Sequence, residues 1–245
     1  MATALRLAMK SVIIRLPDDI MIEYLANIDQ QWFLTLNGIN SAFFDELFWL
    51  ITGKFAWIPM ICVLLYCSFR HNWKVGVSMI VAVALVITLC DQISSGIIKD
   101  AVCRLRPTHN PDIGGLVHVV NDYRGGQYGF VSSHAANSFG VAVFLAMVFR
   151  RRLFTWVILA WALILSYSRI YLGVHYPGDI LCGGLLGAAL GALVYCVYKK
   201  VIKAKAITNG KPVFTAKGDA ELLSYTTIGN LLLIILIAII IFMMK

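Results

Sequence analysis

The sequence ILCGGLLGAALGALVYCVY, residues 180–198, carries no charged residue. A stretch of this length and composition suits an α-helix that crosses a bilayer, since a crossing needs about 20 apolar residues. Three of its glycines, Gly183, Gly187 and Gly191, are four residues apart and therefore share one helix face. Such a face lets another helix approach closely. We expect it to pack within the monomer, although dimerisation is an alternative.

The rest of the chain has the same character. Of its 245 residues, 60% are hydrophobic and only 14% are charged, and the mean hydropathy is +0.79. A soluble domain carries about 25% charged residues, so the composition excludes a soluble enzyme and indicates an integral membrane protein. The net charge of +8 is then a question of which membrane side each charge occupies, and no nucleic-acid partner is expected.

Five further apolar segments accompany the first, at residues 47–69, 75–90, 135–149, 153–171 and 222–244. The second is expected to continue as helix toward residue 98, and the third is shorter than a typical span of about 17–25 residues. We predict an all-α fold, a polytopic helical bundle with about six transmembrane helices. Its expected parts are an N-terminal segment 1–46, a five-span core 47–198, a basic cytoplasmic linker 199–221 and a C-terminal transmembrane helix 222–245.

The N-terminal segment contains an amphipathic pattern. Met21, Tyr24, Leu25, Ile28 and Trp32 recur at helical spacing, with charged and amide side chains off that stripe. The pattern predicts a helix lying in the membrane interface, and a helix packed on the protein core is the alternative. Residues 1–16 show no continuous signal-peptide core.

If the spans alternate, the loops separate into two sides. One side holds Arg70 and Lys74, the run of arginines 150–152 and the linker lysines. Short basic loops stay in the cytoplasm, so the other side is expected to face the periplasm or the outside of the cytoplasmic (inner) membrane. The six cysteines form no C-x-x-C or zinc-finger pattern, and neither a disulfide framework nor a cysteine metal site is expected.

Polar residues gather at the ends of four spans, all on the predicted outer side. Charged groups near a membrane core are costly and usually functional, and alternation brings these to one level of the bundle. They are Lys99 and Arg106 after the second span, Ser132, Ser133 and His134 at the start of the third, Ser168 and Arg169 at the end of the fourth, and His175 and Asp179 before the fifth.

The types of these residues indicate a phosphate site. Lys99, Arg106 and Arg169 are cations that can hold the oxygens of one phosphate. Ser132 and Ser133 precede a helix, where free backbone N–H groups and the helix dipole favour an anion. Taken singly, Lys99, Arg104 and Arg106 are explained as juxtamembrane anchors and the serines as a helix N-cap. Their convergence from separate loops favours a site.

Two histidines complete the set. Phosphoryl transfer to water can use one histidine as nucleophile and another to protonate the leaving oxygen. Asp179 lies four residues after His175 and can accept a hydrogen bond from one ring nitrogen, leaving the other free to attack. A purely structural His175–Asp179 pair, and a structural His134, are the alternatives.

These residues resemble the type 2 phosphatidic acid phosphatase superfamily over about residues 40–198. The first family motif, Lys-x₆-Arg-Pro, is present as KDAVCRLRP, and the third, Ser-Arg-x₅-His-x₃-Asp, as SRIYLGVHYPGD. The second, Pro-Ser-Gly-His, is VSSH here, so that Val131 replaces proline and Ser133 replaces glycine. The Ser133 side chain either crowds the phosphate or adds a hydrogen bond to it.

The resemblance implies a catalytic role for each motif residue. His175 would form a phosphohistidine, Asp179 would orient it, and His134 would protonate the leaving group and then activate water. The implied phosphate-binding residues are Lys99, Arg106, Ser132, Ser133 and Arg169.

The resemblance also implies an activity. The expected protein is a metal-independent lipid phosphate phosphatase without cofactor, acting at the outer membrane face on undecaprenyl diphosphate or a lipid A phosphate, or on phosphatidylglycerol phosphate or phosphatidic acid. A lipid phosphotransferase and a non-enzymatic lipid-binding or transport protein are the alternatives. The related vanadate-dependent haloperoxidases are soluble, which the composition argues against. The oligomeric state is left open.

Overall fold

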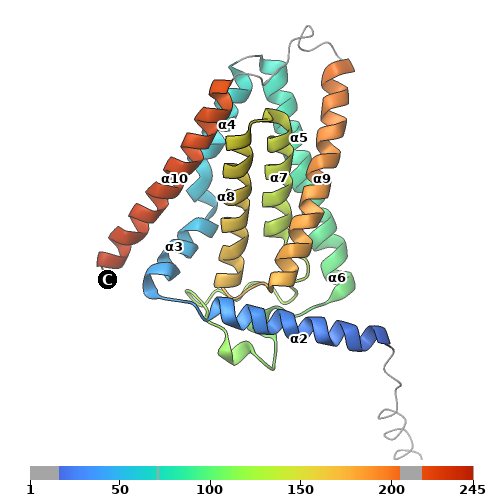
Figure 1. Cartoon of the computed structure of the whole chain (residues 1–245), viewed down its shortest axis with the longest axis vertical. Coiled ribbons are helices and arrows are strands. Elements are labelled where there is room, and N and C mark those ends of the chain that lie inside the picture. The colour runs from blue at the N-terminus through green and yellow to red at the C-terminus, as the bar shows by residue number, and fades with distance from the viewer. Residues whose placement is uncertain (1–16, 71, 205–216, 245) are drawn as a thin grey trace, which may run out of the picture.

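The computed structural model describes residues 17–70, 72–204 and 217–244, and these residues form helices with no strand among them (Figure 1). This confirms the all-α prediction. The longer helices are α2 (Pro17–Asn37), α3 (Ala42–Thr52), α4 (Ile58–Phe69), α5 (Trp73–Ile93), α7 (Ser133–Phe149), α8 (Arg152–Tyr171), α9 (Pro177–Ala204) and α10 (Lys217–Met244).

Several of these helices are suited to cross a membrane. Four are long and apolar enough, at residues 73–102, 152–171, 177–201 and 218–244, and α3 with α4 can form a fifth, broken span. The shorter apolar helix α7 runs beside them (Figure 1). Its lower end carries the polar residues Ser133 and His134, so its apolar part is short for a span. The expected count of about six agrees with this arrangement.

The first span is interrupted near its middle. The helices α3 and α4 meet at an angle of 72°, with a 3₁₀ turn, η1 (Lys54–Trp57), between them. Gly53 is extended and Pro59 lies in the first turn of α4, so neither favours a continuous helix. Two carbonyls freed by the break accept side-chain donors: the Trp57 indole bonds to Ile51 at 2.9 Å and the Asn230 amide to Ala56 at 2.7 Å. Apolar surroundings require such partners.

The glycine stripe of α9 packs on α7, inside the monomer as expected. A Cβ atom on Gly183 would lie 2.5 Å from the Ser132 carbonyl oxygen. Gly187 and Gly191 face the α7 backbone at Ala136 and Gly140 even more closely. Because only a hydrogen fits at these positions, the start of α7 is held against the start of α9.

The predicted linker is shorter than its expected bounds. The helix α9 continues to Ala204 and α10 begins at Lys217, because the lysines that follow the apolar run are themselves good helix formers. Only residues 205–216 separate the two helices, and these, like residues 1–16, lie outside the described residues.

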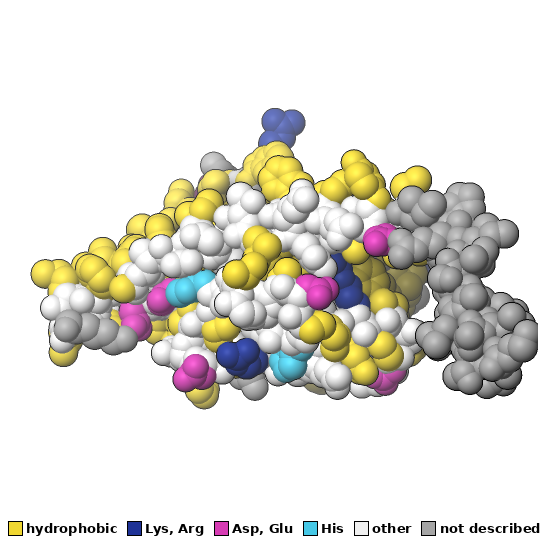
Figure 2. All heavy atoms as spheres, turned by 90° about the horizontal axis from the view of Figure 1, so that it is seen from below, with side chains coloured by type: hydrophobic (Ala, Val, Ile, Leu, Met, Phe, Trp, Pro, Cys, Tyr) yellow, Lys and Arg dark blue, Asp and Glu magenta, His cyan; other side chains and the backbone are white. Residues whose placement is uncertain are grey.

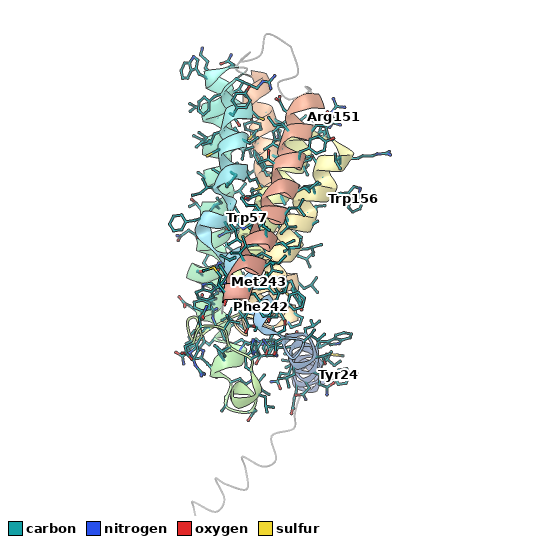
Figure 3. All side chains as sticks on the ribbon, turned by 90° about the vertical axis from the view of Figure 1, so that its left-hand side faces the viewer. Tyr24, Trp57, Arg151, Trp156, Phe242 and Met243 are labelled. Atoms are coloured by element: carbon teal, nitrogen blue, oxygen red, sulfur yellow. The ribbon has the colours of Figure 1, made fainter. Side chains whose placement is uncertain are left out.

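The helix α2 lies across the lower ends of the spans, the end at which α10 also finishes (Figure 1). Phe33 is fully buried, whereas Met21, Tyr24, Leu25 and Trp32 are each more than half exposed. Tyr24 projects from α2 below the spans in Figure 3. The helix therefore docks on the protein through one face and leaves most of its apolar stripe uncovered.

Candidate active site

The predicted site residues come from four segments that meet at the lower end of the bundle, next to α2. The face seen from below shows few basic side chains (Figure 2). One reason is that several site residues are inside the protein: Arg169 is only 2% exposed, His175 1% and Asp179 0%. The structure thus brings together ionisable groups from distant parts of the sequence in a largely buried position.

Lys99 reaches the start of α7. The helix α5 passes through a π-helical turn, η2 (Ser94–Ile98), into the short helix α6 (Lys99–Val102). The Lys99 ammonium donates to the Ser133 hydroxyl at 2.9 Å, and the Ser94 hydroxyl donates to the same oxygen at 2.8 Å. Ser133, which replaces the glycine of the second motif, therefore joins the cation to the helix N-terminus instead of pointing away from it.

Arg106 is fixed by the loop that follows α6. Its Nε donates to the Tyr128 carbonyl at 3.1 Å, next to an isolated antiparallel bridge between Leu105 and Tyr128. Gly125 has a positive φ of 68°, and a Cβ atom there would lie 2.6 Å from an Arg106 nitrogen. A glycine is therefore required for the loop to close over the guanidinium.

Arg169, near the end of α8, is held from two sides. Its Nη1 donates to the Thr52 hydroxyl at 2.8 Å, at the end of α3, and its Nη2 donates to the Tyr123 hydroxyl at 3.0 Å. Its buried Nε has no hydrogen-bond partner among the described residues. This leaves one N–H of a fixed cation available for an acceptor such as a phosphate oxygen.

His175 and Asp179 form the buried pair expected from their spacing. The His175 Nδ1 lies 3.4 Å from the Asp179 Oδ2, which also accepts from the Tyr176 N–H at 3.0 Å. The His175 ring bonds in addition to the backbone of Gly129. Burial, followed by the positive charge of Arg106, lowers the pKa of His175 well below its ordinary value. The ring is therefore neutral near pH 7 and retains a nitrogen lone pair.

His134 and Ser132 lie at the start of α7, His134 as its second residue and Ser132 as its N-cap. The His134 side chain is exposed, and it interacts electrostatically with His175, Arg169 and other cations of the site. Ser132 caps the helix by accepting from the Ala135 N–H at 3.4 Å, and its own N–H donates to the Asp179 carbonyl at 3.0 Å. The Ser132 side chain thus has the N-cap role that the sequence also allowed.

The contacts that Arg104 and Asp29 make in this region were not predicted from the sequence. Arg104 reads as a juxtamembrane anchor, yet its Nη1 donates to the Asp179 Oδ1 at 2.9 Å. Its Nη2 pairs with Asp29 of α2 at 2.8 Å. The available signal was spacing, because Arg104 and Arg106 are two residues apart and side chains so spaced share one face of an extended segment.

Possible metal ligands are scattered. Within residues 17–70, 72–204 and 217–244 no group of three or more His, Cys, Asp or Glu side chains is placed to hold a metal ion. All six cysteines lie in these ranges and are free thiols.

Lys99, Arg106 and Arg169 interact electrostatically with one another, and all three also act on the buried His175. Such a group of cations, at one end of a bundle of apolar helices, suits the binding of an anion such as phosphate. The model of the PAP2 superfamily matches residues 72–203, more than half of the chain, and the chain belongs to this superfamily. It is a multi-pass membrane lipid phosphatase of the PAP2 type, a hydrolase, as the sequence motifs predicted.

Similar proteins agree with this assignment. The chain is 46% identical over 184 residues to the lipid A 4′-phosphatase of Bacteroides thetaiotaomicron, covering 74% of this chain and 81% of that protein. It is 39% identical to the lipid A 4′-phosphatase of Porphyromonas gingivalis, covering 72% and 75%. Its fold matches a transmembrane PAP2 type phosphatidylglycerolphosphate phosphatase from Bacillus subtilis with a TM-score of 0.54 at 22% identity, covering 73% and 88%.

Proposed function

We propose that the protein hydrolyses the 4′-phosphate of lipid A, through a phosphohistidine on His175. The observation that carries the mechanism is the neutral, buried His175 held beside Asp179 and within the field of Arg106, Arg169 and Lys99. The substrate is supported by the two relatives of that name, which are 46% and 39% identical.

The reaction runs in two steps. A ring nitrogen of His175 attacks phosphorus while the bond from phosphorus to the lipid oxygen breaks. His134, protonated when the anionic phosphate is bound among the cations, gives that oxygen a proton. His134, now neutral, takes a proton from water, and the water oxygen attacks phosphorus while the bond from phosphorus to the His175 nitrogen breaks. This releases inorganic phosphate and returns both histidines to their starting states. The developing charge on the phosphoryl oxygens is stabilised by Lys99, Arg106 and Arg169, with the N–H groups at the start of α7.

The proposal is tested with the purified protein in detergent, by measuring phosphate released from a panel of lipid phosphates in the presence of EDTA. We expect release from lipid A that is unaffected by EDTA, with slower release from undecaprenyl diphosphate, phosphatidylglycerol phosphate and phosphatidic acid. Mass spectrometry of the lipid product identifies the position that has lost its phosphate. Loss of activity with EDTA that added metal restores would contradict the mechanism. Turnover that requires an alcohol acceptor would show a phosphotransferase instead.

The orientation in the membrane is a second part of the proposal. The site end of the bundle is expected to face the periplasm of the inner membrane, because the short basic loops lie at the opposite end (Figure 1). Cys103, the residue after α6, is an exposed free thiol at the site end.

In intact spheroplasts we expect a membrane-impermeant maleimide to label Cys103, and the Cys103→Ser variant to lose that label. A matched variant carries Lys74→Cys, at the other end, in the Cys103→Ser background, and we expect it to be labelled only after the membrane is opened. The reverse pattern would place the site in the cytoplasm.

A further inference from the structure

The inward face of α2 contacts the segments that build the active site. Asp29, Phe33 and Asn37 are four residues apart and therefore lie on one face of the helix. The Asn37 amide donates to the carbonyls of Ile170 and Tyr171, at 3.2 and 2.8 Å. The N-terminal helix is thus bonded to the end of α8, close to Arg169.

Two of these positions lie beside the first turn of α9. The Phe33 ring meets the Tyr176 ring edge to face, with centroids 5.4 Å apart. The Asp29 Oδ1 accepts from the Gly178 N–H at 2.7 Å. A Cβ atom on Gly178 would lie 2.6 Å from the Asp29 carboxylate, so the glycine allows this close approach.

Arg104 connects Asp29 to Asp179. Its guanidinium donates one nitrogen to Asp179 at 2.9 Å and another to Asp29 at 2.8 Å, and its central carbon lies 4.1 Å from the centre of the Tyr176 ring. Asp179 is completely buried, whereas the Arg104 side chain is 24% exposed and the Asp29 side chain 14%. A continuous chain of charged contacts therefore runs from α2 to the carboxylate beside His175.

A buried carboxylate remains ionised only when it is well paired and hydrogen-bonded. Each Asp179 oxygen has a separate role: Oδ1 accepts from Arg104, and Oδ2 accepts from Tyr176 and faces His175. Arg104 is the cation in direct contact with this carboxylate, and it fixes the direction of the carboxylate plane as well as its charge.

We propose that Arg104 and Asp29 are positioning residues for the phosphatase reaction. Arg104 keeps Asp179 ionised and turned toward His175, and Asp29 keeps the guanidinium of Arg104 and the first turn of α9 in place. The helix α2 is then part of the catalytic unit and not a separate N-terminal segment. This inference rests on the proposed role of His175 and Asp179.

The test compares Arg104→Gln, Arg104→Lys and Asp29→Asn with the unmodified protein. For Arg104→Gln we expect kcat to fall about 10–100-fold, by analogy with the loss seen when the residue that orients a metal-ligating histidine is removed. KM, and the inhibition constant of inorganic phosphate, should change by less than about threefold, since the phosphate cations are untouched. Arg104→Lys, which keeps a charge, should recover part of the loss. Arg124→Gln, an exposed arginine of the same loop, is the matched control.

The double variant Asp29→Asn/Arg104→Gln separates positioning from general stability. If Asp29 acts through Arg104, the double variant has nearly the kcat of Arg104→Gln alone. Effects that multiply, a kcat of Arg104→Gln equal to that of the control, or a parallel loss of phosphate binding would overturn the inference. If Arg104→Gln does not fold, the same measurements on Asp29→Asn and Arg104→Lys test the proposal. Failure of the proposed function is distinct, because His175→Ala would then retain turnover.

Discussion

Replacing His175 with alanine is expected to lower phosphate release from lipid A at least about 10⁴-fold, because removing a catalytic nucleophile leaves only the contribution of the binding groups. The His175 imidazole is buried, and its Nδ1 lies 3.4 Å from the Asp179 carboxylate. Radiolabelled lipid, quenched in base to preserve an acid-labile phosphohistidine, should label the unmodified protein and not the variant.

The matched control for this variant is His109→Ala. His109 is exposed in the loop after α6, where its Nδ1 contacts the neighbouring Thr108 hydroxyl, and its loss should leave turnover nearly unchanged. Thermal unfolding in detergent should be similar for the two variants. Retained phosphate release by His175→Ala would exclude the nucleophile and favour the lipid-binding or transport interpretation.

The membrane fold was predictable because few kinds of sequence are compatible with crossing a bilayer. A transmembrane helix needs a long uncharged segment. Charged residues at the ends of such helices are costly and are usually functional. Alternation of the spans is sufficient to bring Lys99, Arg106, Arg169 and His175 to one end of the bundle. The start of α7 follows the same rule. Its apolar run is short because Ser133, at its first position, makes a polar contact with Lys99.

The contacts that were not predictable depend on the tertiary fold. The break after α3 is stabilised by an amide donated from Asn230, 174 residues further along the chain. The pairing of Asp29 with Arg104 requires α2 to lie across the lower end of the bundle, whereas its apolar stripe is equally suited to a free interfacial helix. Side-chain spacing alone does not determine which face of such a helix docks.

The second large effect is expected at Arg169, where Arg169→Lys should lower kcat/KM about 10²–10³-fold, as for loss of one preorganised donor to a developing oxyanion. Two guanidinium nitrogens are already bonded to Thr52 and Tyr123, and the buried Nε has no other acceptor in the described part of the chain. A lysine keeps the charge but has no planar fork with which to hold both hydroxyls and a phosphate oxygen.

The matched control at this position is Tyr123→Phe, which removes one hydrogen bond from Arg169 while keeping the ring whose centre lies 5.3 Å from the guanidinium carbon. Because Thr52 still anchors the guanidinium, we expect a loss in kcat/KM of less than about tenfold for Tyr123→Phe. Steady-state kinetics on lipid A, with inorganic phosphate as competitive inhibitor, measure both variants. Equal kcat/KM for Arg169→Lys and the unmodified protein would show that only the charge at this position matters and that its buried N–H does not contact the phosphoryl group.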